Sequence, residues 1–598
     1  MASRIEDYAL IGDCQTAALV GRDGSIDWLC VPRFDSGACF AALLGGPEHG
    51  RWLVAPAEPI VRVTRAYRGD TLVLDTTFET ASGAVTVTDC MPIRTTCPDL
   101  VRLVTGVRGT VRMRVEVVIR FDYGSITPWV RREDGGITAV GGPDTLILRT
   151  PVPLHGEGWT TVADFEVAAG DEVPFVLSWH PSHDPLVPQT DARRAIAATA
   201  RWWETWSARC PYQGQWRDAV LRSLITLKAL TYQPTGGIVA APTTSLPEHL
   251  GGQRNWDYRF CWLRDSTFTL AALMQSGHID EAREWRAWLL RAVAGRGEEL
   301  RVMYGLAGER RMAEFEVPWL PGYEGSSPVR IGNAAADQFQ LDVYGEVLDC
   351  LHLGRRFQLD GHADDLDWRI ELELLRRLEA VWQEPDEGIW EVRGPRRHFT
   401  HSKLMAWVGF DRAVKDVEQF GLDGPVERWR ELRDQLHAEI CERAFDRERN
   451  TFVQYYGATE VDAALLMMAQ VGFLPATDPR IAGTVAAVER DLLRDGFVDR
   501  YRSHTGVDGL PPGEGAFLLC TCWLADNYAL MGRVDDARRI LERVLAARND
   551  VGLLAEEYDP VLRRQLGNFP QAFSHLALIN TAQNLTQRQK PAEVRQEA

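Results

Sequence analysis

The sequence predicts a multidomain β-plus-α protein, with an N-terminal antiparallel β-sandwich followed by an (α/α)6 helical barrel. Two observations support this fold class. Residues 50–180 alternate apolar and polar side chains and are interrupted by frequent turn signals, as half-buried strands are. From residue 214 onward, apolar residues recur at helical spacing instead. The chain has 598 residues, of which 45% are hydrophobic, so it can form two large cores.

The predicted sandwich domain spans residues 1–190. It begins with a stretch in which RDGS, residues 22–25, separates two apolar runs and indicates a hairpin turn. The alternating segments that follow are broken by ASG, GGP and AAGD, which are turn sequences. Short alternating strands with regular turns are typical of a large antiparallel sandwich.

A predicted linker helix, residues 191–213, leads to the barrel domain, residues 214–590. Six helical hairpins would close into a ring of inner helices wrapped by outer ones. Residues 515–532 are apolar nearly all round, as an inner helix requires, whereas residues 426–445 are amphipathic, as an outer helix requires. The twelve predicted helical segments are 216–232, 264–276, 280–296, 334–356, 366–383, 401–420, 426–446, 461–473, 480–496, 514–533, 535–548 and 571–585.

The charge of the chain excludes several classes of partner. Its formal net charge of -18 argues against nucleic acid and against an anionic membrane surface, because both select basic proteins. The four lysines do not form a Gly-Lys-Ser/Thr phosphate loop, which argues against nucleotide chemistry. A neutral small molecule is the favoured ligand, and a homo-oligomer is left open.

The cysteines and the N-terminus predict a cytoplasmic protein. Eleven cysteines are scattered without C-x-x-C spacing, which is typical of buried thiols in a reducing compartment. The first twelve residues carry acids where a secretory signal would have an apolar run, and no apolar stretch approaches the ~18 residues of a membrane span.

Four long loops between the predicted helices are rich in aromatic and charged residues. Such loops carry binding sites more often than the elements they connect. Tryptophan beside Asp, Glu and Arg suits a sugar, which has an apolar face for stacking and hydroxyls for hydrogen bonds. The four loops are residues 251–266, 317–333, 384–402 and 551–570.

Two of these loops contain candidates for a pair of catalytic acids. Glu391 follows Ile389 and Trp390, and apolar neighbours favour the protonated form of a carboxyl group, which a general acid needs. Hydrolysis of a glycosidic bond usually takes a second carboxyl group. Glu556 or Glu557, in LLAEEYD, is the candidate partner.

These motifs together resemble glycoside hydrolase family 15, the glucoamylase and bacterial trehalase family. RNWDYRFCWLRDS resembles the family's aromatic, Trp, Arg-Asp signature, GIWEVRG its general-acid loop, and LLAEEYD its general-base loop. The resemblance runs from IEDYALIG, near the N-terminus, to about residue 585. It implies an inverting, exo-acting hydrolase that releases glucose from an α-glucoside by direct attack of water, without a cofactor or metal.

The resemblance also implies roles for individual residues. Glu391 would protonate the glycosidic oxygen, and Glu556 would deprotonate the attacking water. An inverting pair of carboxyl groups lies ~6.5 to 9.5 Å apart, and that separation is predicted here. The residues that would bind the sugar are Tyr258 and Trp262 as the wall of the terminal-glucose subsite, Arg264 and Asp265 as hydroxyl ligands, Trp390 before the acid, and Arg500.

One departure from the family pattern bears on the substrate. Fungal-type glucoamylases have a second acid directly after the general acid, whereas this chain has Val392. With the predicted cytoplasmic location, this favours a small α-glucoside such as trehalose over starch. The alternatives are hydrolysis of malto- or isomalto-oligosaccharides, phosphorolysis, and sugar binding without catalysis.

Other candidates have structural interpretations. His180 and His183 have a spacing that a metal could use, but a third ligand is not evident, and the same holds for the pair His398 and His401. Asn333, Asp337 and Gln338 lie where a loop enters a helix, so Asn333 could be the N-cap of this helix, or these residues could bind hydroxyl groups. Cys520 and Cys522, two apart on a helix, are predicted to be packing residues.

Overall fold

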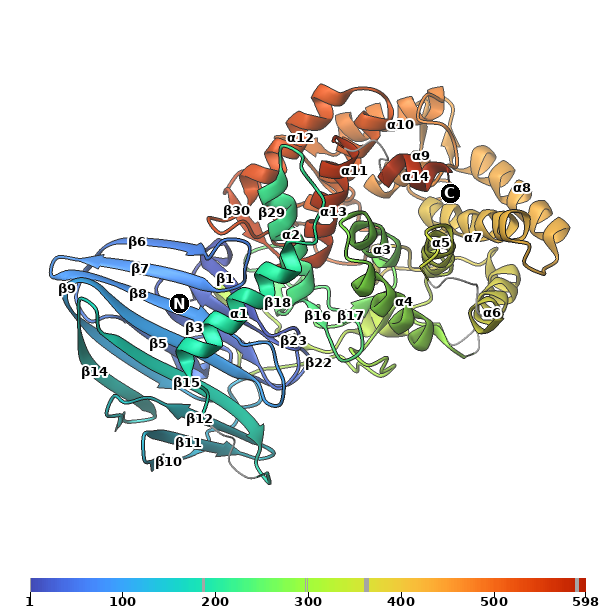
Figure 1. The fold of residues 1–598 in the computed structure, drawn as a ribbon. Helices are drawn as coiled ribbons and strands as arrows, with labels where there is room; N and C mark the ends of the chain where they lie inside the picture. The colour runs from blue at the N-terminus through green and yellow to red at the C-terminus, as the bar shows by residue number, and fades with distance from the viewer. Residues whose placement is uncertain are drawn as a thin grey trace.

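The computed structural model describes residues 2–184, 189–295, 297, 300–359, 365–586 and 591–597. Within these ranges, the N-terminal part is a 15-stranded antiparallel sheet and the remainder is mainly helical (Figure 1). The predicted order of a large antiparallel sheet followed by helices is confirmed. The strands of the sheet are β1 Tyr8–Gly12, β2 Ala17–Gly21, β3 Ser25–Cys30, β4 Ala38–Phe40, β5 Arg51–Pro56, β6 Ile60–Tyr67, β7 Leu74–Thr80, β8 Gly83–Cys90, β9 Asp99–Val118, β10 Trp129–Glu133, β11 Gly136–Gly141, β12 Asp144–Arg149, β13 His155–Glu157, β14 Thr160–Ala168 and β15 Glu172–Pro181.

The long strand β9 belongs to two packed layers of strands. Its residues 99–109 pair with β8 and β15, whereas residues 110–118 pair with β5 and β14. The pairing of β2 with β3 confirms the predicted hairpin turn. The two layers meet at this turn. Gly24 in this turn has φ +87°, and a Cβ there would lie 2.4 Å from the carbonyl oxygen of Val54 and 3.1 Å from the ring of Phe78. Only glycine fits between the layers at this point.

The helix α1 (Ala192–Ser207) follows the sheet and covers part of one face (Figure 1). Asp191 caps its N-terminus, since its side chain accepts a hydrogen bond from the amide of Arg194. Ala195 and Ile196 pack against Val101 of β9. The boundaries proposed for the two domains and the linker stay a prediction, and residues 1, 185–188, 296, 298–299, 360–364 and 587–590 of the proposed segments lie outside the described residues.

Each of the twelve predicted helical segments contains a helix in the described part of the chain. The segment 334–356 is interrupted, since a 3-10 turn over Ala334–Asp337 precedes its α-helix, and the segment 461–473 is a 3-10 turn, η7 (Ala463–Leu466), followed by one short helix. The helices are α2 Arg217–Ala229, α3 Ser266–Gln275, α4 Ile279–Val293, α5 Asp342–Arg356, α6 Asp365–Val381, α7 Thr400–Phe420, α8 Val426–Arg443, α9 Met467–Gln470, α10 Pro479–Asp491, α11 Leu518–Leu530, α12 Val534–Ala547, α13 Ala572–Asn584 and α14 Pro591–Glu597.

Six of these elements form a closed ring of contacts. In chain order α3, α5, α7, η7 with α9, α11 and α13 each contact the next, and α13 contacts α3. The intervening helices contact this ring from outside, such as α4 on α3, α8 on α7 and α12 on α11. Burial follows the same division, because α11 is buried on all sides whereas α8 buries one stripe that includes Trp429, Leu432 and Leu436. The predicted apolar character of α11 and the predicted amphipathic character of α8 agree with this burial.

The sheet supports the segment 242–259, which contains the strands β18 (Thr244–Pro247) and β19 (Asn255–Asp257). The indole nitrogen of Trp28 in β3 donates a hydrogen bond to the carbonyl of Pro242, before β18, over 2.8 Å. Arg259, just after β19, donates to the carbonyl of Ser36 over 3.0 Å and is paired with Asp257 in the buried interior. These contacts fix the segment that carries the predicted aromatic signature. Across the described ranges, no helix combines the length and the apolar composition needed to cross a bilayer.

Candidate active site

Six of the eight predicted site residues line one cavity at the end of the helical ring. They come from segments that are far apart in the sequence, and they are Tyr258, Arg264, Trp390, Glu391, Arg500 and Glu556. The other two lie directly behind the cavity wall. The Nε1 of Trp262 is 2.6 Å from Glu391, and Asp265 is 3.4 Å from the Nε of Arg264.

Two donors hold the carboxylate of Glu391. Its Oε1 accepts hydrogen bonds from the indole nitrogen of Trp262 and, over 3.1 Å, from Arg264. Arg264 also donates to the carbonyl of Ile389 over 2.8 Å, so one guanidinium fixes both the side chain and the loop. Glu391 has φ +57°, a left-handed conformation that costs energy for a residue with a Cβ. Strain of this kind often marks a functional position.

Glu556 lies at the other wall and is almost fully buried, with 2% of its surface exposed. Its Oε1 accepts a hydrogen bond from the hydroxyl of Tyr258 over 2.7 Å. Its Oε2 is buried without a hydrogen-bond partner among the described residues. One oxygen is therefore oriented by the Tyr258 hydroxyl, whereas the other has no donor among the described residues.

The two carboxylates are connected through neighbouring aromatic rings. Tyr258, bonded to Glu556, and Trp262, bonded to Glu391, meet edge to face with ring centroids 5.3 Å apart. A single loop thus orients both acids toward one cavity. The separation of the two carboxyl groups stays a prediction.

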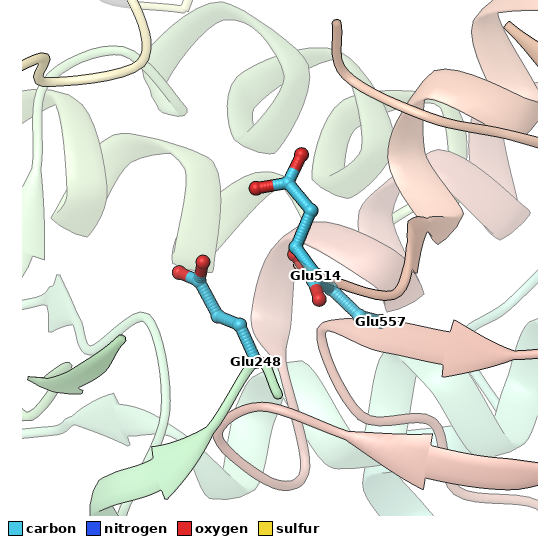
Figure 2. Close-up of side chains that lie close together, drawn as sticks. All are labelled: Glu248, Glu514 and Glu557. Carbon is cyan, nitrogen blue, oxygen red and sulfur yellow. The ribbon is translucent and has the colours of Figure 1, made fainter. Parts of the chain in front are cut away.

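Arg500 forms the centre of a buried cluster of glutamates beside the cavity. Its Nη2 lies 2.7 Å from Glu248, 2.6 Å from Glu514 and 3.4 Å from Glu557. Figure 2 shows these glutamates converging from three separate segments. Their carboxyl oxygens lie within 4.8 Å of one another, a spacing that could hold a metal ion, but the guanidinium already lies among them. Glu557 is thereby held in this cluster, whereas Glu556 lines the cavity.

Models of two families match the chain. The one described as glycosyl hydrolases family 15 matches residues 214–583, and the one described as trehalase-like, N-terminal, matches residues 1–202. The chain belongs to glycosyl hydrolase family 15. The predicted family and the prediction of a glycoside hydrolase are confirmed.

Similar proteins cover nearly the whole chain. A trehalase of Mycobacterium tuberculosis is 38% identical over 98% of this chain and 90% of its own length. A trehalase of Thermoplasma volcanium is 34% identical over 97% of this chain and 93% of its own length. A crystal structure of a bacterial glucoamylase complexed with acarbose matches with a TM-score of 0.73 at 12% identity, covering 100% of this chain and 96% of that one. This last match shows a shared fold.

The pKa of Glu556 is raised to about 8, first by burial and then by the nearby carboxylate of Glu248, against the opposing effects of Arg500 and of the Tyr258 hydroxyl. Burial also raises the pKa of Tyr258 well above its ordinary value, so the phenol keeps its proton and remains a donor. The family 15 site therefore includes, in Glu556, a carboxyl group whose charge changes near neutral pH.

The activity is expected to depend on pH through Glu556. A base must be ionised, and a raised pKa means that the ionised fraction increases as the pH rises toward about 8. We expect kcat/KM to rise roughly tenfold per pH unit along the acidic limb of the profile, where the ionisation of Glu556 limits the rate. Glu248→Gln removes one neighbouring charge and should move this limb of the pH profile to lower pH. An unchanged limb in this variant would contradict the assignment of the pKa to Glu556.

Gly567 is predicted to be essential for the position of Glu556. It has φ +74°, and a Cβ at this residue would lie 2.6 Å from the Oε2 of Glu556 and 2.7 Å from its Cβ. Gly567→Ala should lower kcat by about 100-fold, because a small displacement of a catalytic group costs about that much. The matched control is Gly532→Ala, which has φ +77° but open space around the Cβ. Equal loss of kcat in both variants would mean that backbone strain alone is responsible.

Several further residues complete the site, among them Gln338, one of the predicted hydroxyl-binding candidates, and Asp462, which no sequence motif indicated. Asp462 accepts hydrogen bonds from the indole nitrogen of Trp390 over 2.9 and 3.0 Å. The amide of Gln338 donates to the carbonyl oxygens of Glu391 and Val392 over 3.1 and 3.2 Å, which fixes the acid loop. The cavity wall also includes Trp256 and Phe517, among others.

The remaining candidates have structural roles. Asn333 caps the turn that follows it, accepting from the amide of Ala335, although it also lines the cavity. His180 is buried with its Nδ1 2.8 Å from the carbonyl of Pro181, whereas His183 is exposed. His401 is buried 4.0 Å from Asp342, and His398 stacks on a tyrosine ring. Asp337 pairs with Arg301 at the surface, and Cys520 and Cys522 are buried thiols.

Proposed function

We propose that the protein is an inverting, exo-acting α-glucosidase that hydrolyses trehalose. The observation that carries this proposal is the pair Glu391 and Glu556, which line one cavity and are oriented by two adjoining aromatic rings. A family 15 enzyme with both carboxyl groups has the acid and the base that direct hydrolysis needs.

The reaction requires two proton transfers. Glu391, in its protonated form, gives its proton to the glycosidic oxygen as the bond from that oxygen to the anomeric carbon breaks. A water molecule attacks the same carbon from the opposite face, and Glu556 takes the proton that this water loses. The anomeric centre is inverted, and the two glutamates have exchanged protonation states, which solvent restores. Arg264 and Asp265 are assigned to sugar hydroxyls, and Trp390 and Tyr258 to the walls of the subsite.

Trehalose is the substrate that the combined observations favour. Proteins called trehalases align with this chain over nearly its full length at 34 and 38% identity. Val392 takes the position of the leaving-group acid of fungal-type glucoamylases, and its side chain lines the cavity. Hydrolysis of malto- or isomalto-oligosaccharides is the alternative.

Proton NMR of the reaction tests this proposal. With α,α-trehalose, inversion at one anomeric carbon releases one β-glucose, while the leaving glucose keeps its α configuration. Equal initial amounts of the two anomers are expected, and α-glucose alone would mean retention. Maltose, isomaltose and a malto-oligosaccharide are compared under the same conditions. Faster turnover of one of these would mean that its linkage, and not that of trehalose, is the preferred substrate linkage. Binding of all four sugars without turnover would favour a sugar-binding protein.

We infer that the helices form an (α/α)6 barrel. The closed ring of contacts from α3 through α13 supplies six inner elements, and α2, α4, α6, α8, α10 and α12 are the outer ones. The glucoamylase fold match is consistent with this arrangement. We also propose a reducing, cytoplasmic location, because all eleven cysteines are free thiols.

A further inference from the structure

A second cavity lies between two edge strands of the sheet. Its volume is about 410 Å³, within the range of small-molecule sites. β10 forms one side of it, and the hairpin of β13 and β14 forms the other. In Figure 1, β10 lies at the lower end of the sheet, away from the helices α5 to α8. This β10–β13 cavity is therefore separate from the active site.

The rim of the β10–β13 cavity carries two exposed tryptophans. Trp129 is 67% exposed and Trp159 is 79% exposed, although large aromatic side chains are usually buried. The floor is apolar and buried, and includes Val117, Ile119 and Ile137. Arg131 lies over one face of the Trp129 ring, 4.9 Å from its centroid. Exposed indole rings beside an apolar floor suit a ligand with a ring face.

Arg120 gives the cavity an uncompensated positive charge. It lines the cavity and is only 9% exposed. Its side chain donates a hydrogen bond to the carbonyl of Ile119. Burial lowers the pKa of Arg120, and no described acid opposes this effect. The guanidinium therefore faces the cavity without an acidic partner, and it can donate charge-assisted hydrogen bonds to an anion there.

The other ionisable side chains that line the cavity are basic. Arg132 and His155 line it, and the described lining contains neither aspartate nor glutamate, although the chain has a net charge of -18. Arg132 donates to the carbonyl of Leu154 over 2.7 Å and connects the two sides. Glu157, which lies outside the lining, pairs with His155 and leaves Arg120 unneutralised.

We propose that the β10–β13 cavity binds a small anionic sugar, with its ring against Trp129 and Trp159 and its acidic group on Arg120. The two sources of such a ligand are a sugar acid and a sugar phosphate, which share one pyranose ring and one anionic group. A guanidinium binds either group through charge-assisted hydrogen bonds. Neither tryptophan lines the active site, so this binding is separate from the hydrolysis of trehalose.

Isothermal titration calorimetry of the full-length protein tests the proposal. The probes are glucuronate and glucose 6-phosphate, with glucose as a ring without charge and sulfate as a charge without a ring. At least one anionic sugar should bind to the wild-type protein. Its affinity should fall at least tenfold in both Arg120→Met and Trp159→Ala. Whether glucuronate or glucose 6-phosphate binds shows whether the cavity takes a carboxylate or a phosphate. Any binding of glucose at the active site should be unchanged in these variants.

The variants also separate binding from folding. Arg120→Met removes an unpaired buried charge, so the protein without ligand should be at least as stable as the wild type. Arg108→Met, an exposed arginine on β9, is the matched control and should bind like the wild type. Binding that none of the variants alters would overturn the proposal, as would equal affinity for sulfate. A change in sedimentation coefficient in Trp159→Ala would overturn it in favour of an interface between copies of the chain.

Discussion

Replacing Glu391 with glutamine is expected to lower kcat for trehalose by about 10²- to 10⁴-fold, the usual contribution of a general acid. Glutamine has the same shape and its amide oxygen can still accept the hydrogen bond from Trp262, so the geometry of the site should be kept. It cannot donate a proton to the glycosidic oxygen in the way that the acid does. Initial rates of glucose release measure the effect. Glu384→Gln, an exposed glutamate seven residues earlier, should have wild-type activity.

A substrate with a better leaving group distinguishes loss of the acid from general damage. Fluoride leaves without being protonated, so the hydrolysis of α-glucosyl fluoride does not need a general acid. Glu391→Gln should therefore keep most of its activity on this substrate while losing it on trehalose. Equal losses on both substrates would contradict the role of Glu391 as the acid and would indicate a disturbed site.

The helices and the sheet were predictable because their side-chain patterns are local. The apolar surface of residues 515–532 and the amphipathic stripe of residues 426–445 follow from 3.6 residues per turn, and both became helices of the predicted kind. The predicted helix boundaries were less accurate where a turn interrupts the helical spacing of apolar residues. In the segment 334–356, Asn333 caps a 3-10 turn, and the α-helix begins only at Asp342.

The candidate acids were predictable for a different reason, because they lie in short motifs that resemble those of a known family. The residues that hold them were not. Gln338 donates to the acid loop from 53 residues away, and Trp390 bonds to Asp462 across 72 residues. Such contacts depend on how the helical hairpins are arranged in space, which no local pattern encodes. Glu248 and Glu514 were missed because a glutamate in a polar loop looks like a surface residue until Arg500 is found beside it.

Glu556→Gln is expected to lower kcat by a similar factor, about 10²- to 10⁴-fold, but with a different dependence on substrate. The base activates water whatever the leaving group is, so α-glucosyl fluoride should not restore the activity. Glutamine can still accept the hydrogen bond from Tyr258, and burial no longer opposes a charge at this position. The melting temperature should therefore be no lower than that of the wild type. Glu542→Gln, an exposed change on α12, is the control.

A smaller side chain at position 556 should allow an external nucleophile to replace the water that Glu556 activates. In Glu556→Ala the space of the carboxylate is free, and azide is nucleophilic without a base. With α-glucosyl fluoride and azide, this variant is expected to form β-glucosyl azide, whose configuration NMR determines directly. The β product follows from attack on the face opposite the leaving group, which is the side assigned to Glu556. An α product would require attack from the face of the leaving group, and Glu556 could not then be the base of an inverting enzyme.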